Sequence, residues 1–114
     1  MPELPEVQTV VNYIKPMCVG KRLTRVKPVW SKVLHNFNEG FNSSSKDNKV
    51  RDVYRRAKFI IIAFEDYVLA VHLRMTGKLY MADNNFQSKY ITAVFEFEGG
   101  DSLFFEDVRK FGRV

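Results

Sequence analysis

The feature that most constrains the fold is an alternating segment in the last quarter of the sequence, followed directly by two glycines. Between residues 90 and 98, every second side chain is apolar, which is the period of a β-strand with one buried face. The apolar set is Ile91, Ala93, Phe95 and Phe97, and the opposite set is Thr92, Val94, Glu96 and Glu98. Gly99-Gly100 allows a tight hairpin turn, and residues 102–105 supply a return strand. The segment predicts antiparallel β-structure.

Most of the chain after residue 20 has the same β character. Residues 22–30 predict a strand in which Pro28 indicates a sheet edge or a bulge. Two apolar runs, 59–64 and 67–73, are separated by Glu65-Asp66 and predict a second hairpin. Several short strands linked by polar turns are typical of a sandwich or a barrel.

One helix is predicted, at the start of the chain. Apolar residues recur at spacings of three and four, which gives one apolar stripe: Leu4, Val7, Val10, Val11 and Ile14. Pro5 and Glu6 suit the first helical turn, and Pro16 should stop or kink the helix before Gly20. The predicted fold is therefore mainly β, a β-sandwich or flattened barrel with an N-terminal α-helix.

Length and charge narrow the class of protein. The chain has 114 residues, enough for one domain, with a formal net charge of +5 and a pI of about 9.4. A basic balance favours polyanionic partners, although it also serves solubility. The single cysteine, Cys18, excludes an intrachain disulfide and an all-cysteine zinc site, and it fits a reducing, cytosolic setting. No secretory signal or membrane-spanning run is visible.

The first six residues, MPELPE, raise the possibility of chemistry at the amino terminus. Removal of Met1 would leave Pro2 with a free secondary amine, and a fraction of such α-amino groups is neutral and nucleophilic at pH 7. Glu3 beside it can transfer protons. The alternative is an ordinary helix start, which this short motif alone does not exclude.

Three further motifs follow MPELPE in order along the chain. They are Arg55-Arg56-Ala57-Lys58 before an apolar run, HLRMTG over residues 72–77, and DVRKFG over residues 107–112. Together the four motifs closely resemble the N-terminal domain of formamidopyrimidine-DNA glycosylase, in the family shared with endonuclease VIII. That family excises oxidised bases and nicks the resulting abasic site. The resemblance runs from residue 1 to residue 112.

The resemblance implies four catalytic residues. Pro2 matches the nucleophile that attacks C1′ of the damaged nucleotide, and Glu3 matches the carboxylate that protonates the opening sugar ring. Glu6 matches a supporting acid, and Lys58 matches a hairpin lysine that contacts phosphate and assists catalysis. Taken singly, Lys58 could be an ordinary surface lysine before a strand, and Glu6 an acid that suits the start of a helix.

Four DNA-binding residues follow from the same resemblance. His72 matches a phosphate contact, while Met75, Arg109 and Phe111 match the side chains that fill the gap left by the flipped base. The roles suit the residue types, because flipping a base leaves a vacancy that apolar side chains can occupy and arginine can hydrogen-bond the widowed base. Taken singly, His72, Met75 and Phe111 could instead be core residues.

Some positions depart from the family pattern. Arg74 stands where the family usually has glycine, Val108 replaces a proline and Lys110 replaces an arginine. Residues 89–92 differ from a usual His-Asp-His stretch, and the polar segment 36–48, predicted to be an exposed loop, also diverges. These differences affect the fine DNA contacts.

The family resemblance also carries expectations about domains and partners. Residues 1–114 are expected to be the catalytic N-terminal domain of a longer protein, whose helix–two-turn–helix segment and zinc finger are absent here. No metal or other cofactor is expected within this chain, since the zinc of the family belongs to that later part. The expected partner is damaged double-stranded DNA, in the cytoplasm on bacterial nucleoid DNA or in the nucleus, without membrane contact. A monomer with little activity in isolation is expected.

The predicted function is base-excision repair by a bifunctional glycosylase and AP lyase. Leu4 and the three gap-filling residues resemble the branch acting on oxidised purines, 8-oxoguanine and formamidopyrimidines. Alternatives are an oxidised-pyrimidine glycosylase of the endonuclease VIII branch and a non-catalytic nucleic-acid-binding domain. An N-terminal-proline tautomerase is a further alternative, but such enzymes run from the proline into a strand rather than into a helix.

Overall fold

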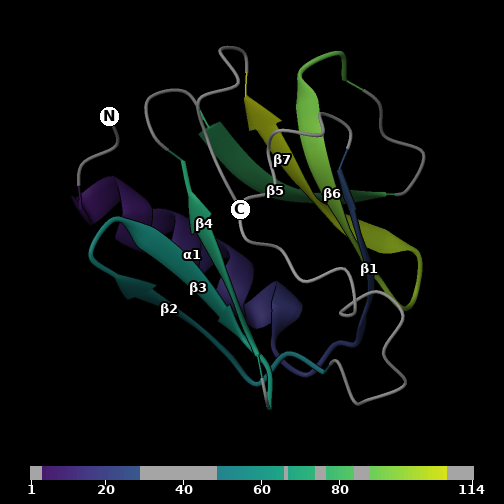
Figure 1. Cartoon of the computed structure of the whole chain (residues 1–114), viewed down its shortest axis with the longest axis horizontal. Helices are drawn as coiled ribbons and strands as arrows, with labels where there is room; N and C mark the ends of the chain where they lie inside the picture. Colours follow the sequence, from purple (N-terminus) through teal and green to yellow (C-terminus); the bar gives the residue numbers. More distant parts are fainter. Residues whose placement is uncertain (1–3, 29–48, 66, 74–76, 84–87, 108–114) are drawn as a thin grey trace.

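The computed structural model describes residues 4–28, 49–65, 67–73, 77–83 and 88–107 (Figure 1). These ranges contain one helix, α1 (Leu4–Cys18), followed by seven strands. The strands are β1 (Leu23–Pro28), β2 (Asp52–Arg56), β3 (Phe59–Ala63), β4 (Val68–His72), β5 (Gly77–Asp83), β6 (Ile91–Phe97) and β7 (Asp101–Asp107). A mainly β fold with an N-terminal helix is therefore confirmed.

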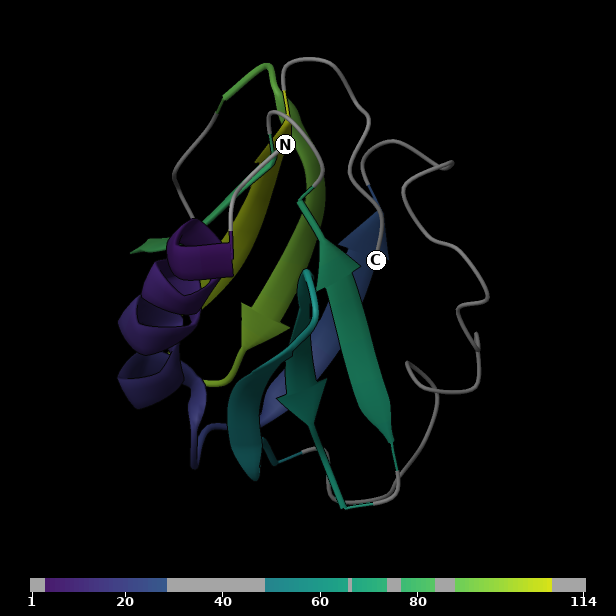
Figure 2. The same ribbon diagram turned by 90° about the vertical axis from the view of Figure 1, so that its left-hand side faces the viewer.

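The strands form two antiparallel sheets. One has the order β1-β6-β7-β5 and the other the order β2-β3-β4. The inward faces of both sheets and the α1 residues Val7, Val11 and Ile14 share one buried core, in which Ile14, Val26 and Phe95 have no exposed surface. The helix packs against β2 in one sheet and β5 in the other. It therefore closes one open side of a two-layer sandwich (Figures 1 and 2).

The β6–β7 hairpin has the predicted form, with one local exception. Gly99 and Gly100 both have positive φ, 101° and 99°, a conformation that a tight turn needs and that side chains resist. Thr92 was expected on the exposed face but is fully buried, and its hydroxyl donates to the Phe105 carbonyl at 3.3 Å. A register shift between Ile91 and Ala93 accompanies this burial.

The helix runs further than the sequence indicated. Pro16 was expected to stop or kink α1, yet the helix continues through it to Cys18. A proline lacks only its own N–H, so near the end of a helix it removes one hydrogen bond while the following residues still bond. The Val19 N–H donates to the Lys15 carbonyl at 3.0 Å, and the complete burial of Cys18 holds the last turn against the core.

A short backbone junction joins the two sheets after the helix. The Gly20 N–H donates to the Val50 carbonyl at 2.9 Å, and the Val50 N–H donates to the Lys21 carbonyl at 2.8 Å. On the other side, the Glu98 N–H donates to the Arg22 carbonyl at 3.0 Å. Segment 20–22 is therefore hydrogen-bonded both to the residues before β2 and to the residue after β6. The edge strand β1 follows directly after it.

Two strands, β2 and β5, were not predicted. β2 reads DVYRR and has only Val53 fully buried, so its charged residues conceal the period of a strand. β5 reads GKLYMAD and is half-buried along most of its length. The edge position predicted from Pro28 is confirmed for β1. In the part of the chain that the structure describes, no helix is long and apolar enough to cross a membrane.

Candidate nucleic-acid interface

Three of the eight predicted site residues fall within the described ranges, and all three lie at one end of the molecule. Glu6 is exposed in the first turn of α1, Lys58 lies in the turn between β2 and β3, and His72 ends β4. In Figure 2, the start of α1, this turn and the end of β4 all lie on the side facing the viewer. We call this region the helix-start end.

The other five predicted residues lie outside the described ranges. They are Pro2, Glu3, Met75, Arg109 and Phe111. The helix that follows Pro2 and the strands that flank the other segments are nevertheless described. The roles of these five residues remain predictions from the sequence resemblance.

Lys58 occupies a tight turn whose geometry is set by its neighbours. Arg56 and Phe59 are directly paired across the β2–β3 ladder, so Ala57 and Lys58 are the only turn residues. Ala57 has a φ of 53°, an uncommon conformation for a residue with a side chain. The guanidinium Nη1 of Arg55 donates to the Ala57 carbonyl at 2.9 Å, which supports that conformation.

The same arginine links the turn to the helix. Nε of Arg55 donates to Oε1 of Gln8 at 3.4 Å, and Nε2 of Gln8 donates to Oδ1 of Asn12 at 3.0 Å. Gln8 is two residues from Glu6. These side-chain hydrogen bonds therefore join the first turns of α1 to the Lys58 turn. The first turns of α1 and the hairpin lysine are thereby placed at the same end. Sequence reasoning identified Lys58 but missed the roles of Gln8 and Arg55, which no local pattern indicates.

His72 lies opposite Phe59 in the β3–β4 ladder. The centroids of the two rings are 4.9 Å apart and the rings are nearly perpendicular, at 89°. His72 is half-buried rather than enclosed in the core. The structure therefore contradicts the alternative that His72 is a core residue. Phe59 is 42% exposed, although it begins an apolar run.

The strands next to the predicted gap-filling segments are firmly held. The Gly77 N–H donates to the Leu73 carbonyl at 2.9 Å, and Gly77 pairs with Asp107 across β5 and β7. A Cβ on Gly77 would lie 2.6 Å from the Leu73 carbonyl oxygen and 2.8 Å from the Phe105 ring. This close approach explains the glycine of the HLRMTG motif. The Asp107 N–H donates to the Tyr90 carbonyl at 2.9 Å.

A hydrogen-bonded carboxylate lies one residue before Asp107. Oε2 of Glu106 accepts from the Tyr80 hydroxyl at 2.7 Å and from the Ser88 hydroxyl at 2.9 Å. Partial burial, together with the hydrogen bond to Glu106, holds the pKa of Tyr80 well above its usual range. This network connects β5, β7 and the residues before β6.

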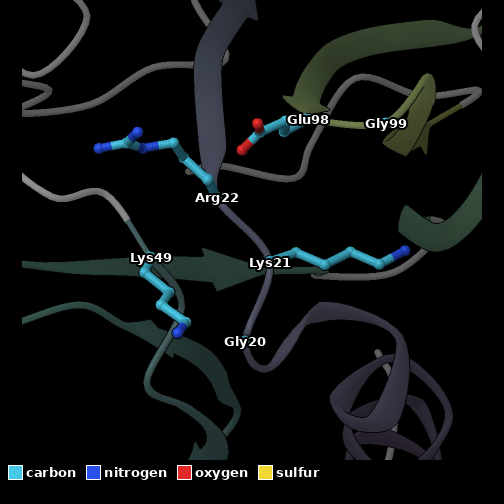
Figure 3. Close-up of a pocket in the computed structure, with 6 residues that line it drawn as sticks. All are labelled: Gly20, Lys21, Arg22, Lys49, Glu98 and Gly99. Atoms are coloured by element: carbon cyan, nitrogen blue, oxygen red, sulfur yellow. The ribbon is translucent and has the colours of Figure 1, made fainter.

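A second basic region lies at the opposite end of α1. A hollow of about 560 Å³ is lined by Gly20, Lys21, Arg22, Lys49, Glu98 and Gly99 (Figure 3). Lys21 and Arg22 leave the chain in opposite directions, so these two charges do not converge on one point (Figure 3). The intervening helix has 15 residues, which corresponds to roughly 22 Å at 1.5 Å per residue. Of the predicted site residues that the structure describes, Glu6, Lys58 and His72, none lines this hollow.

The described ranges provide no metal centre. Within them, no group of three or more His, Cys, Asp or Glu side chains is placed to hold an ion. Cys18 is buried, and desolvation raises its pKa to about 11, so the thiolate that would bind a metal is disfavoured. A four-cysteine zinc site does not fit a chain with one cysteine.

Comparison with known proteins gives the same family along the whole chain. Residues 1–114 match the family model of the formamidopyrimidine-DNA glycosylase N-terminal domain. The formamidopyrimidine-DNA glycosylase of Streptococcus pneumoniae is 36% identical over 115 residues, and that of Brevibacillus brevis is 39% identical over 118 residues. Each alignment covers 100% of this chain and 42% of the relative, so the chain spans less than half the length of these curated relatives.

Solved structures of a bacterial relative have the same fold. The Lactococcus lactis formamidopyrimidine-DNA glycosylase, non-covalently bound to DNA containing an abasic site, has a TM-score of 0.88 and 28% identity, and the match covers 98% of this chain and 44% of that one. A complex of the same protein with DNA containing an oxidised pyrimidine gives a TM-score of 0.88 and 29% identity, covering 98% and 42%. The chain thus belongs to the formamidopyrimidine-DNA glycosylase family, to which it corresponds as the N-terminal domain.

Proposed function

We propose that the protein acts in base-excision repair as a bifunctional DNA glycosylase and AP lyase that removes oxidised purines from double-stranded DNA. The observation that carries the proposal is the family match over residues 1–114, which includes all eight predicted site residues. The grouping of Glu6, Lys58 and His72 at the helix-start end supports it. So do the complexes of the L. lactis relative with abasic and formamidopyrimidine DNA.

The proposed chemistry begins with the Pro2 amine, once Met1 is removed. Its nitrogen forms a bond to C1′ and releases its proton while the bond from C1′ to the damaged base breaks, and the base leaves with that electron pair and takes up a proton. Glu3 protonates O4′ as the sugar ring opens, which leaves a cationic iminium (Schiff base) between Pro2 and C1′. The iminium acidifies the C2′ proton, so the 3′ phosphate and then the 5′ phosphate leave by β- and δ-elimination.

The remaining site residues would hold the DNA during these steps. A nucleotide must leave the duplex before its C1′ is accessible, which requires a few kcal/mol of unstacking and unpairing. Met75, Arg109 and Phe111 are proposed to fill the vacancy, while Lys58 and His72 hold the displaced backbone through its phosphates. Glu6 is proposed as a supporting acid near the flipped nucleotide. Such DNA would be met in the bacterial cytoplasm, with the protein acting as a monomer.

One observation favours a wider substrate range. The L. lactis relative has been crystallised with DNA containing an oxidised pyrimidine as well as with formamidopyrimidine DNA. An oxidised-pyrimidine activity is therefore the second candidate. Competition between 8-oxoguanine and an oxidised pyrimidine in matched duplexes would rank the two.

The decisive experiment traps the iminium. The natural, full-length gene product is incubated with a duplex containing an abasic site, borohydride is added, and covalent adducts are separated on a denaturing gel. Wild type should give an adduct, and Pro2→Gly should give none while it still binds the duplex. Mass spectrometry of the intact protein checks that Met1 is absent, because a retained Met1 makes the Pro2 nitrogen an unreactive amide.

Two results would contradict the proposal. An adduct that survives in Pro2→Gly, and that peptide mapping places on a residue other than the new amino-terminal glycine, would mean that another amine is the nucleophile. DNA binding by wild type with Met1 removed, but without any adduct, would favour a non-catalytic nucleic-acid-binding protein.

A further inference from the structure

The Phe59 side chain is exposed, so packing in the core does not explain why this position has an aromatic residue. Its strand neighbour Ile60 has no exposed surface and faces the core, so Phe59 points to the outer face of the three-stranded sheet. It directly follows Lys58 and lies directly opposite His72. Both of these residues are assigned to phosphate contact in the proposed function.

We propose that Phe59 is a positioning residue that orients the His72 imidazole for its contact with a DNA phosphate. The inference rests on the proposed function and adds a residue to it. Phe59 and His72 form the last pair of the β3–β4 ladder at the helix-start end. Their rings meet at 4.9 Å and 89°, so the phenyl ring occupies one side of the imidazole.

A fixed imidazole matters because its hydrogen bonds are directional. A ring N–H must point at a phosphate oxygen to bind it, and the ring can otherwise turn about two side-chain torsions. Holding the ring before DNA arrives avoids part of the entropy lost on binding. The perpendicular phenyl ring restricts those torsions, and the paired strands fix both Cα atoms.

The competing account is that Phe59 and His72 are an ordinary cross-strand pair that stabilises the sheet. In that case removal of the phenyl ring lowers the stability of the protein but leaves the phosphate contact intact. The two accounts differ in how the effects of two substitutions combine, and in the salt dependence of DNA binding.

The chain offers a matched control on the same hairpin. Val68 is another exposed apolar residue, 57% exposed, and it pairs with Ala63 at the far end of the β3–β4 ladder. Val68→Ala therefore removes exposed apolar surface from the same sheet without touching His72. Phe59→Tyr serves as the conservative rescue, since it keeps the ring.

The test measures the affinity of the full-length gene product for a duplex carrying a non-cleavable abasic-site analogue, at several salt concentrations. We expect His72→Gln to weaken binding roughly tenfold and Phe59→Ala roughly fivefold, the scale of one lost polar contact. In the His72→Gln background, Phe59→Ala should add less than about twofold, because its partner is already gone. Phe59→Tyr and Val68→Ala should bind like wild type.

Salt supplies an independent readout. Each phosphate contact made by a cation contributes about 0.9 to the slope of log affinity against log salt. At a pH below about 6, where an imidazole is normally protonated, His72→Gln should lower that slope by at most about 0.9 and Phe59→Ala by part of that amount, whereas a purely structural effect leaves it unchanged. If Phe59→Ala does not fold, Phe59→Leu removes the ring while keeping apolar bulk.

Several outcomes would overturn the inference. One is an equal loss of affinity from Phe59→Ala in both backgrounds, and another is an unchanged salt slope. Equal weakening by Val68→Ala would do the same. If wild type forms the borohydride adduct but Phe59 variants bind normally, only the positioning role fails. If wild type neither binds nor forms an adduct, the proposed function fails and the positioning role fails with it.

Discussion

The two ends of α1 are both basic, but they are built differently. At the helix-start end, Lys58 and His72 lie beside an exposed phenyl ring, and Arg55 ties the hairpin turn to the helix. At the other end, Lys21 and Arg22 diverge around an open hollow that also contains Glu98. Net charge by itself therefore does not distinguish the proposed DNA interface from the hollow. What distinguishes the proposed interface is the ring contact between Phe59 and His72, next to the turn that carries Lys58.

The sharpest way to test this difference is to remove one lysine from each end. We expect Lys58→Ala to slow cleavage of abasic DNA by about 10²-fold, the scale of a misplaced substrate, because this lysine is proposed to hold the DNA backbone through a phosphate. Lys49→Ala should change the rate by less than about twofold, since Lys49 lines the hollow at the other end of α1, remote from the proposed site. Single-turnover cleavage by the full-length protein measures both. Equal losses would mean that the hollow also contacts DNA.

The second test concerns the glycine at the helix-start end. Gly77→Ala should lower the free energy of unfolding by about 2–3 kcal/mol, because its Cβ would meet the Leu73 carbonyl at 2.6 Å and the backbone must shift. Urea denaturation followed by circular dichroism gives the value. A loss below about 0.5 kcal/mol would show that this junction is loose.

The third test concerns the glycine at the other end of the helix. Gly20 has a φ of 88°, and a Cβ added to it would have no atom within 4 Å, so alanine there is strained by its backbone alone. We expect Gly20→Ala to lower the free energy of unfolding by about 1 kcal/mol. The affinity for DNA should stay unchanged, which contrasts with variants at the helix-start end. Thermal denaturation and a binding titration measure the two quantities.

The smallest expected effect comes from Cys18 at the end of α1. Burial raises its pKa to about 11 from 9.0, so the folded protein keeps this proton while the unfolded chain loses it. Stability is therefore lost as the pH rises from 9 toward 11, by less than about 1 kcal/mol at pH ~9.5. Cys18→Ala should lack this component, and the difference between the two proteins isolates it. Identical pH profiles would contradict the raised pKa.

Much of the fold follows from local patterns in the sequence. Strict alternation before Gly99-Gly100 predicted the β6–β7 hairpin, and spacing of three and four predicted α1. β2 was missed because four of its five residues are polar or aromatic and only Val53 is fully buried. The prediction that Pro16 stops the helix was wrong, because burial of the last helical turn compensates for one missing hydrogen bond.

The candidate site was predicted from ordered motifs rather than from periodicity. Lys58 and His72 are 14 positions apart, and only the β3–β4 register places them at the same end. The Gln8–Arg55 hydrogen bond spans 47 positions, and the Phe59–His72 ring contact depends on the exact pairing of two strands. Such contacts between distant segments are properties of the tertiary structure, so no local pattern reveals them.

The two-residue turn that carries Lys58 also restricts how this part of the gene can vary. Ala57 and Lys58 are the whole turn between the paired residues Arg56 and Phe59, so the turn cannot take up an extra residue without a change of its geometry. One inserted residue, if absorbed into β3, would exchange the two faces of the strand and turn Ile60 and Ile62 away from the core. We therefore expect natural relatives to differ here in side-chain identity but not in length, so that the spacing from Lys58 to the core varies less than the residues around it.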